Sequence, residues 1–276
     1  MFKLALNAGH YLGTAGKRCA KALDPNETRE WWLNDRIVDG IEKILADYDG
    51  IEILRIDDTT GAKDISLANR TAKANKWGAD FYLSIHHNAS AKIFDGGGIV
   101  AYVYTSPGAE SLAWQKALYD ASVKATGLKG NRATPLAKKN LHEVRETNMA
   151  ACLMEMGFMT STVDVPQILS EEFAEKSAKA LADVIIERAG LKKKAVVTPK
   201  KVLYRVQVGS YSELGYATKL LSKLKAEGFV GYVRTITVDG KVRHRVQVGA
   251  FSNKSYATAL LSRLKAAGYA GYITTN

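Results

Sequence analysis

The sequence predicts an α/β domain with a mostly parallel sheet flanked by helices, followed by a small α+β domain. Two observations predict this. The first 190 residues alternate short apolar runs with longer amphipathic runs, and the residues after 201 contain one pattern twice. Alternating strands and helices are typical of layered α/β folds, and 276 residues suit one sizeable domain and one smaller one. We therefore expect domains over residues 1–190 and 202–276, joined by a linker over residues 191–201.

The elements of the first domain follow from the period of its apolar residues. The expected strands are Phe2–Leu6, Ile51–Ile56, Asp80–Ile85, Gly98–Tyr104 and Ala151–Met154. The expected helices are Thr28–Ala46, Ser66–Trp77, Glu110–Thr126 and Glu171–Ala189. No apolar run approaches the ~20 residues that a membrane span needs, so we expect no membrane insertion.

The second domain is predicted from a boundary and an internal repeat. A glycine, a lysine run and a proline mark the boundary within Ala189–Lys201. Beyond it, Arg205–Val233 and Arg245–Ile273 are identical at 18 of 29 positions, with a period of 40 residues. Each repeat reads as strand, helix and strand, and Asp239-Gly240 between them is a hairpin signal. We expect a ferredoxin-like βαββαβ domain with one antiparallel sheet and both helices on one face.

The positive charge of the chain is concentrated in its C-terminal part. From Gly190 onward there are 16 Lys and Arg residues against 3 Asp and Glu, whereas the preceding residues have 23 against 25. Such a surplus favours an anionic polymer, such as nucleic acid, a lipid surface or an anionic cell wall. The alternative is a basic surface that only keeps the domain soluble.

Alternation along the strands of the repeat predicts which residues lie on the open face of the second sheet. The valines of each Val-Gln-Val stretch should point toward the helices, which puts Arg205, Gln207, Arg245 and Gln247 on the opposite face. An open face with Gln, Arg and nearby Tyr suits a sugar polymer. Gln207 and Gln247 are therefore candidate substrate-binding residues.

Four side chains of the first domain are expected at one edge of its sheet. His10, His86 and Glu155 each follow or end a predicted strand, and Glu30 lies at the start of the first predicted helix. Because ligands of open α/β sheets bind beyond the carboxyl ends of the strands, we expect a site there.

Two of these four positions have neighbours that compete with them. Glu27 and Glu30 both open the same helix, and either could interact with its dipole. His87 is adjacent to His86; alternation places His86 on the same side as Ser84, but the end of the strand is loosely defined. The residues alone leave both choices open.

The chemistry of this set indicates a metal-dependent hydrolase. Two imidazoles and one carboxylate suit a catalytic Zn²⁺ with a fourth position for water, which makes His10, Glu30 and His86 candidate ligands. The metal lowers the pKa of its water from ~15.7 to about 7. Glu155 is then the candidate catalytic base, which takes a proton and passes it to the leaving group.

Four motifs in the first domain resemble the type-3 family of zinc N-acetylmuramoyl-L-alanine amidases. They are Asn7–His10, Glu30–Asn34, Ser84–Ala89 and Met154–Phe158, and they occur in the order of the family. The resemblance covers roughly residues 1–190. It implies the fold of the family, Zn²⁺ as cofactor, and hydrolysis of the amide between muramic acid and L-alanine in peptidoglycan.

The resemblance also implies which competing residue serves as ligand. In that family the Glu four residues before an Asn on the first helix binds zinc, which selects Glu30 over Glu27. The first His of the Ser-Ile-His-x-Asn stretch is the second imidazole ligand, which selects His86 over His87.

Further roles are implied by the same motifs. The Glu before x-Gly-Phe is catalytic in the family, which selects Glu155. Arg145 resembles the arginine that precedes this strand, and with Asn88 of the Ser-Ile-His-x-Asn stretch it is a candidate for substrate binding. The sequence departs from the family after the first His, where Tyr11–Gly16 replaces the usual Gly-rich loop.

The second domain resembles the sporulation-related repeat (SPOR) family through both Val-Gln-Val-Gly stretches and the βαββαβ pattern. That family binds peptidoglycan glycan strands, notably those stripped of stem peptides, so peptidoglycan is the implied partner of both domains. RNA-recognition domains, the alternative for a basic βαββαβ sheet, stack bases on paired aromatics. The corresponding strands here have Gln207 and Gln247, so we expect no nucleic acid.

The expected location follows from the N-terminus. Its apolar stretch is too short for a signal peptide, so we expect a protein made in the cytoplasm that reaches the wall after release by a holin or by lysis. An amidase with a wall-binding module and no signal peptide resembles a phage endolysin. The alternatives are a bacterial mother-cell autolysin, a carboxypeptidase acting on the same polymer, and a wall-binding adaptor without activity.

Overall fold

The chain forms two compact units, Met1–Ala195 and Val196–Asn276, in a computed structural model that describes residues 1–130, 135–194 and 202–275. The first unit contains a six-stranded sheet with helices, and the second contains a four-stranded sheet with two helices. Both fold classes are those that the sequence predicts. Among the described residues, no helix combines the length and the apolar character needed to cross a bilayer.

Six strands form the main sheet of the first unit, in the order β3-β1-β4-β7-β5-β6. They are β1 (Phe2–Ala8), β3 (Ile51–Arg55), β4 (Phe81–Asn88), β5 (Val100–Val103), β6 (Leu136–Lys138) and β7 (Ala150–Phe158). The helices are α1 (Glu30–Leu45), α2 (Leu67–Trp77), α3 (Ala109–Thr126), α4 (His142–Arg145), α5 (Val165–Ile168) and α6 (Glu171–Arg188).

The sheet is mostly parallel, with one reversal. β3, β1, β4 and β7 run in the same direction, whereas β5 is antiparallel to β7 and parallel to β6. A parallel neighbour needs a crossover connection, usually a helix. Residues 89–99 contain no helix, and β5 accordingly runs in the opposite direction beside β7. The carboxyl ends of β1, β4 and β7 therefore lie at one edge.

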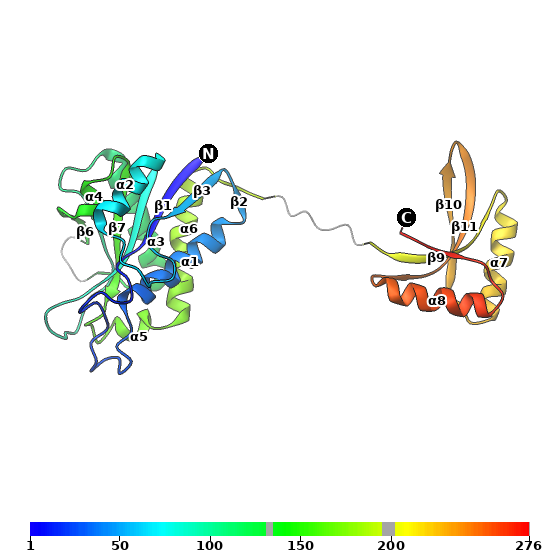
Figure 1. Cartoon of the computed structure of the whole chain (residues 1–276), viewed down its shortest axis with the longest axis horizontal. Helices are drawn as coiled ribbons and strands as arrows, with labels where there is room; N and C mark the ends of the chain where they lie inside the picture. The colour runs from blue at the N-terminus through cyan, green and yellow to red at the C-terminus, as the bar shows by residue number, and fades with distance from the viewer. Residues whose placement is uncertain (131–134, 195–201, 276) are drawn as a thin grey trace. The chain divides into compact units, whose positions relative to one another are not determined.

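Helices cover both faces of this sheet (Figure 1). Leu4 and Leu6 of β1 belong to the core formed with α1, α3 and α6, whereas Ala5 belongs to the core formed with α2 and α4. The side chains of a strand alternate between its two faces. On β4 the same alternation puts Tyr82 on the α2 side and Ile85 on the α1 side. The same alternation continues to the carboxyl end of β4.

The expected linker, residues 191–201, begins before the first unit ends at Ala195. Lys192–Lys193 form β8, which pairs antiparallel with β2 (Tyr48–Asp49), and the backbone N–H of Lys194 donates to Asp47 O at 2.8 Å. The lysine run resembles a linker in composition, but its backbone has a strand partner in the first unit. Residues 195–201, the rest of the expected linker, lie outside the described residues.

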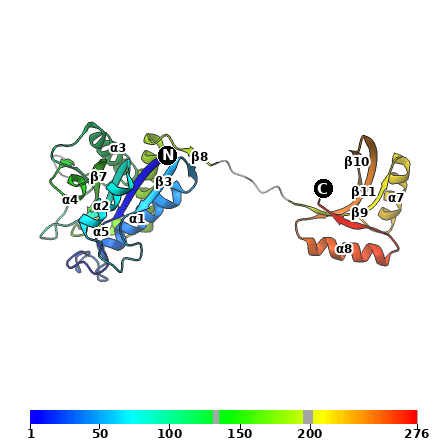
Figure 2. The same ribbon diagram turned by 45° about the horizontal axis from the view of Figure 1, so that its top comes forward.

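The second unit has the predicted βαββαβ order, and its strands are all antiparallel in the order β10-β11-β9-β12. Its elements are β9 (Tyr204–Tyr211), α7 (Leu214–Ala226), β10 (Gly231–Val238), β11 (Lys241–Phe251), α8 (Lys254–Ala266) and β12 (Tyr272–Thr274). Figure 2 shows the long hairpin of β10 and β11. Its turn consists of Asp239 and Gly240, whose φ angles are 50° and 73°. Positive φ at both positions is what a two-residue hairpin turn requires.

The core of the second unit lies between its sheet and both helices. Val206, Val246 and Val248 are buried together with Leu224 of α7 and Leu264 of α8. The repeat therefore uses equivalent leucines in its two helices to cover one face of the sheet, as the sequence predicts.

Candidate metal centre

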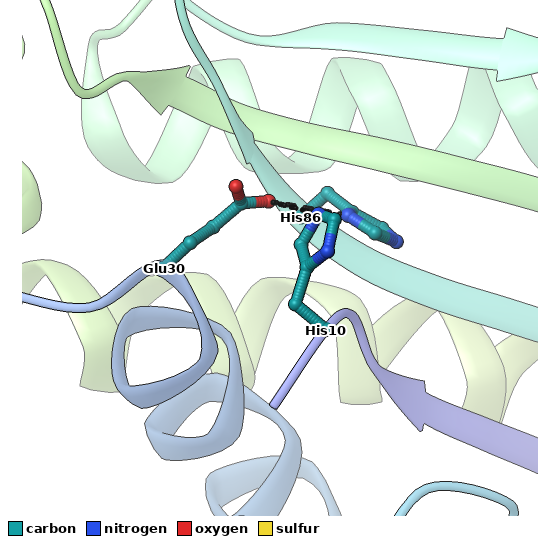
Figure 3. A group of neighbouring side chains, drawn as sticks. All are labelled: His10, Glu30 and His86. Carbon is teal, nitrogen blue, oxygen red and sulfur yellow. Dashed lines mark hydrogen bonds and ion pairs between the residues drawn. The ribbon is translucent and has the colours of Figure 1, made fainter. Parts of the chain in front are cut away.

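The three predicted ligands meet at the carboxyl edge of the main sheet. His10 follows β1, His86 lies near the end of β4, and Glu30 is the first residue of α1. One ligand atom from each of the three side chains lies within 4.8 Å of the other two. Figure 3 shows the three side chains pointing toward one another. These three residues, distant in the sequence, are therefore neighbours in the structure, as the proposed ligand set requires.

The approach of His10 to His86 depends on local backbone geometry. Gly9 N–H donates to Ile85 O at 2.9 Å, which holds the end of β1 against β4. A Cβ atom at Gly9 would lie 2.1 Å from the His86 ring, so no larger residue fits there. His10 itself has a φ of 67°, a left-handed conformation that is uncommon for residues other than Gly. The two imidazoles come to 5.0 Å between ring centroids, at an interplanar angle of 87°.

Glu30 lies between the two imidazoles. Its Oε1 atom is 3.3 Å from His10 Nε2 and 3.2 Å from His86 Nδ1, and it accepts the backbone N–H of His87 at 3.2 Å. Burial raises the pKa of Glu30, but the hydrogen bonds from His10 and His86 outweigh it and hold this pKa well below its usual value. Glu30 is therefore a carboxylate, the form that binds a cation.

The two competing residues have other partners. Glu27 pairs with Arg18, with 3.2 Å between Oε1 and Nε. His87 is buried on the α1 side, where its Nδ1 atom lies 2.8 Å from Asn34 Oδ1. The Nδ2 atom of Asn34 donates to Gly9 O at 3.0 Å. Asn34 therefore joins α1 to the ends of β1 and β4, and His87 has a structural role.

Glu155 lies beside this group on the neighbouring strand. It is the register partner of His86 in the parallel pair of β4 and β7, and strand alternation puts both side chains on the same face. Burial raises the pKa of Glu155 to about 7. Its Oε2 atom is buried without a hydrogen-bond partner. A carboxyl with this pKa and a free oxygen suits a general base near neutral pH.

A cleft of about 220 Å³ borders His10 and His86. His10, Ser66, Arg70, His86 and Glu143 are among the residues that line it. This cleft gives small groups access to the side of the site that faces α2.

Two other predicted residues do not join the group. Arg145 is exposed at the end of α4, where Nε donates to Glu146 Oε1 at 2.6 Å and Nη1 donates to Asn140 Oδ1 at 2.6 Å. Asn88 Oδ1 accepts the backbone N–H of Ala89 at 2.9 Å, at the end of β4. Neither side chain contacts His10, Glu30 or His86 among the described interactions, so their substrate role stays a prediction.

Glu143 is a functional candidate that the sequence did not reveal. It is 4% exposed, and its Oε2 atom lies 3.4 Å from His86 Nε2. It belongs to α4, which has only four residues and therefore no periodicity to detect. Burial lowers the pKa of His86, but its interactions with the carboxylates of Glu143 and Glu30 outweigh this effect and raise the pKa to about 10.

On the second sheet, Gln207 and Gln247 differ from the expectation in their exposure. They are register partners in the middle of the sheet, flanked by Tyr232 on β10 and Tyr272 on β12. Gln207 is 4% exposed and Gln247 is fully buried, so the expectation that they are solvent-exposed is wrong. Alternation predicts the face of a side chain, whereas its exposure depends on the neighbours. Here Tyr232 Oη donates to Gln247 Oε1 at 3.0 Å.

The fold and the site together place two imidazoles and a buried carboxylate at the carboxyl edge of an α/β sheet. The N-acetylmuramoyl-L-alanine amidase family matches residues 4–187, and the chain belongs to this family. Its activity is hydrolysis of the amide between N-acetylmuramic acid and L-alanine in peptidoglycan. The SPOR domain family matches residues 173–235 and 200–275, so the second unit is a SPOR domain.

Individual relatives agree with this assignment. The chain is 32% identical, over 230 residues, to a sporulation-specific N-acetylmuramoyl-L-alanine amidase of Bacillus subtilis. This match covers 83% of each protein. It is 31% identical over 131 residues to an endolysin of Bacillus phage SPP1, and this match covers 47% of each protein. Its fold is similar to the catalytic domain of CwlV from Bacillus (Paenibacillus) polymyxa var. colistinus, with a TM-score of 0.61, 24% identity, and coverage of 70% of this chain and 100% of that one.

Proposed function

We propose that this amidase is zinc-dependent, with His10, Glu30 and His86 as the metal ligands and Glu155 as the general base. The observation that carries the proposal is the meeting of three ligand atoms within 4.8 Å of one another. Two imidazoles and one carboxylate are a known ligand set for catalytic Zn²⁺ and leave a coordination position open. When bound, Zn²⁺ would polarise the amide carbonyl and activate a water molecule.

The residues of the chain account for the proton movements. The partnerless Oε2 atom of Glu155 takes a proton from the attacking water. It then passes this proton to the nitrogen of L-alanine as the C–N bond breaks. The products are a glycan with a free lactyl carboxylate and a stem peptide with a free amino terminus.

We further propose that the SPOR domain binds glycan strands across the row Tyr232, Gln247, Gln207 and Tyr272. The two tyrosines are 42% and 55% exposed, so each offers a ring face to a sugar. Gln207 Oε1 and Gln247 Nε2 have no hydrogen-bond partner although they are buried, which leaves an acceptor and a donor for a polar ligand. The positive charge of this part of the chain favours an anionic wall polymer.

A single digest tests the reaction. Purified peptidoglycan is incubated with the full chain, and the new ends are identified by mass spectrometry. We expect new L-alanine amino termini, their loss after chelation, and their return when Zn²⁺ is added. Free D-alanine would instead indicate a carboxypeptidase, and the absence of new ends would indicate a wall-binding adaptor. Activity that survives complete metal removal would contradict the zinc mechanism.

For the biological setting we propose a phage endolysin, made in the cytoplasm and released onto the wall when a holin opens the membrane. Similarity to the SPP1 endolysin supports this setting. The second candidate, a mother-cell autolysin, is supported by the longer match to the sporulation-specific amidase. Expression in a Bacillus host with and without a holin separates them. Lysis only with the holin supports the endolysin, whereas complementation of a strain that cannot lyse its mother cell supports the autolysin.

A further inference from the structure

The ring of His86 lies between two carboxylates. Its Nδ1 atom is 3.2 Å from Glu30 Oε1, and its Nε2 atom is 3.4 Å from Glu143 Oε2. Figure 3 shows one ring nitrogen directed at Glu30 and the other turned away from it. Nδ1 is therefore the nitrogen available to a metal shared with Glu30 and His10, and Nε2 is the nitrogen available to Glu143.

Glu143 is held in place by three donors. Its Oε1 atom accepts from Asn7 Nδ2 at 2.8 Å, from Tyr82 Oη at 2.8 Å and from Ser84 Oγ at 3.3 Å. These donors come from β1 and β4, and they all approach the same oxygen. The other oxygen, Oε2, therefore remains for the ring of His86. A buried carboxylate with this many donors is fixed in position.

Arg70 sets the orientation of this group. Its Nη1 atom donates to Asn7 Oδ1 at 2.6 Å and to Ala8 O at 2.9 Å, and its Nη2 atom donates to His10 O at 2.8 Å. Because a guanidinium can only donate, the amide of Asn7 must present its oxygen to Arg70 and its NH₂ group to Glu143. One buried arginine therefore holds the backbone at His10 and, through Asn7 and Glu143, the ring of His86.

We propose that Glu143 is a positioning residue for the metal centre: its carboxylate accepts the Nε2–H of His86 and thereby keeps the lone pair on Nδ1, directed at the metal. Ligating histidines commonly donate their second N–H to a carboxylate, which fixes the tautomer and the ring orientation. The inference rests on the proposed zinc function. It adds a residue that joins α4 to the site, although α4 supplies no ligand.

Glu143→Gln is the informative variant because the amide side chain has the same shape but only one accepting oxygen. If that oxygen faces Asn7 and Tyr82, the NH₂ group faces His86 and favours the wrong tautomer. If it faces His86, the donors from β1 and β4 lose their acceptor. Glu146→Gln is the matched control, since Glu146 lies three residues further on and pairs with Arg145 at the surface.

The zinc dissociation constant of the full chain is measured by competition with a chromophoric chelator, together with the melting temperature of the metal-free chain. We expect Glu143→Gln to bind zinc roughly 10- to 100-fold more weakly. Glu146→Gln should bind zinc as the wild type does, and Glu143→Asp should recover part of the loss. Unchanged zinc affinity in a folded Glu143→Gln chain would overturn the proposal, even if the melting temperature fell.

A second measurement needs no variant. In the zinc-loaded wild-type chain, ¹⁵N-labelled histidine reports which nitrogen of His86 carries the proton. We expect Nε2–H with Nδ1 on the metal, and Nδ1–H would overturn the proposal. A wild-type chain that binds no zinc would instead contradict the proposed zinc function, so the two failures are distinguishable.

Discussion

At the scale of single residues, two carboxyl groups near His86 have opposite protonation behaviour. Glu30 receives hydrogen bonds from two imidazoles and stays ionised, with a pKa well below its usual value. Glu155 lacks a partner for Oε2, and burial raises its pKa to about 7. Pairs of groups whose environments move their pKa values apart mark acid and base roles in enzymes. This difference supports the proposed roles of Glu30 in metal binding and Glu155 in proton transfer.

The variant Glu155→Gln separates these two roles. We expect it to keep zinc at wild-type affinity, because the ligand atoms of His10, Glu30 and His86 are untouched, and to lose roughly 10²- to 10⁴-fold in turnover. The measurement is zinc content and release of L-alanine amino termini on the same preparation. Loss of zinc together with activity would show that Glu155 is a ligand instead of the base. Glu172→Gln, an exposed carboxyl on α6, serves as the control.

The raised pKa of Glu155 also predicts a dependence of stability on pH. In the unfolded chain this carboxyl loses its proton at about pH 4.3, whereas in the folded chain it keeps the proton until about pH 7. The folded state therefore binds the extra proton between these values, and its stability falls as the pH rises through this window. In the metal-free chain, Glu155→Gln should match the wild type at pH 4 and melt at a higher temperature at pH 8. Equal melting temperatures at pH 8 would contradict the pKa shift.

Single residues also show what the sequence could and could not predict. Alternation along β4 indicated that His86 and not His87 shares the face of Ser84, and the resemblance selected the same residue. No pattern in the sequence indicated Glu143, because a buried carboxylate in a four-residue helix has no periodic spacing. For Gln207 and Gln247 the face was predictable, but their burial depends on side chains from neighbouring strands, such as Tyr232.

At the scale of elements, periodicity predicted the long strands and helices to within a few residues. The expected strand Phe2–Leu6 is β1, and the expected helix Glu171–Ala189 is α6. The short elements β6, α4 and α5 were not predicted, because three or four residues do not complete a period. The reversed direction of β5 was not predicted either, since direction depends on the connection and not on the strand itself.

The N-cap of helix α6 allows a quantitative test of what stabilises this helix. The Ser170 side chain caps it by accepting the Phe173 N–H at 3.1 Å, and the helix packs in the core with α1 and α3. Replacing a serine N-cap by alanine typically costs about 1 kcal/mol, because one backbone N–H loses its partner. We expect Ser170→Ala to lower the stability of the first unit by this amount in denaturant unfolding. The same change at the exposed Ser106 should have little effect, and equal effects at both sites would refute the capping role.

At the scale of the whole molecule, the proposed roles in catalysis and attachment fall on parts of the chain with different charge. The first unit contains the candidate metal centre, whereas the surplus of Lys and Arg lies from Gly190 onward. Attachment should therefore depend on ionic strength, because exposed charges are screened within about 8 Å at physiological salt. Cleavage of a short soluble substrate should depend on ionic strength much less.

The double variant Gln207→Leu with Gln247→Leu tests this separation in the full chain. Leucine keeps the size of the buried side chains but removes the polar atoms that lack partners. We expect weaker cosedimentation with insoluble peptidoglycan and unchanged cleavage of a soluble muropeptide. The variant Gln167→Leu, at a half-buried position in the first unit, controls for the chemistry of the change. Unaltered cosedimentation of the SPOR variant would exclude the glutamine row as the glycan site.

The proposed mechanism requires one zinc ion bound between His10, Glu30 and His86. Zinc content per chain, measured by elemental mass spectrometry after equilibration with a weak chelator, tests it most directly. We predict one zinc per chain in the wild type and in Glu27→Gln and Glu155→Gln, and almost none in His10→Ala, Glu30→Ala or His86→Ala. Stoichiometric zinc that persists in all three alanine variants, each folded, would show that these residues do not hold the metal.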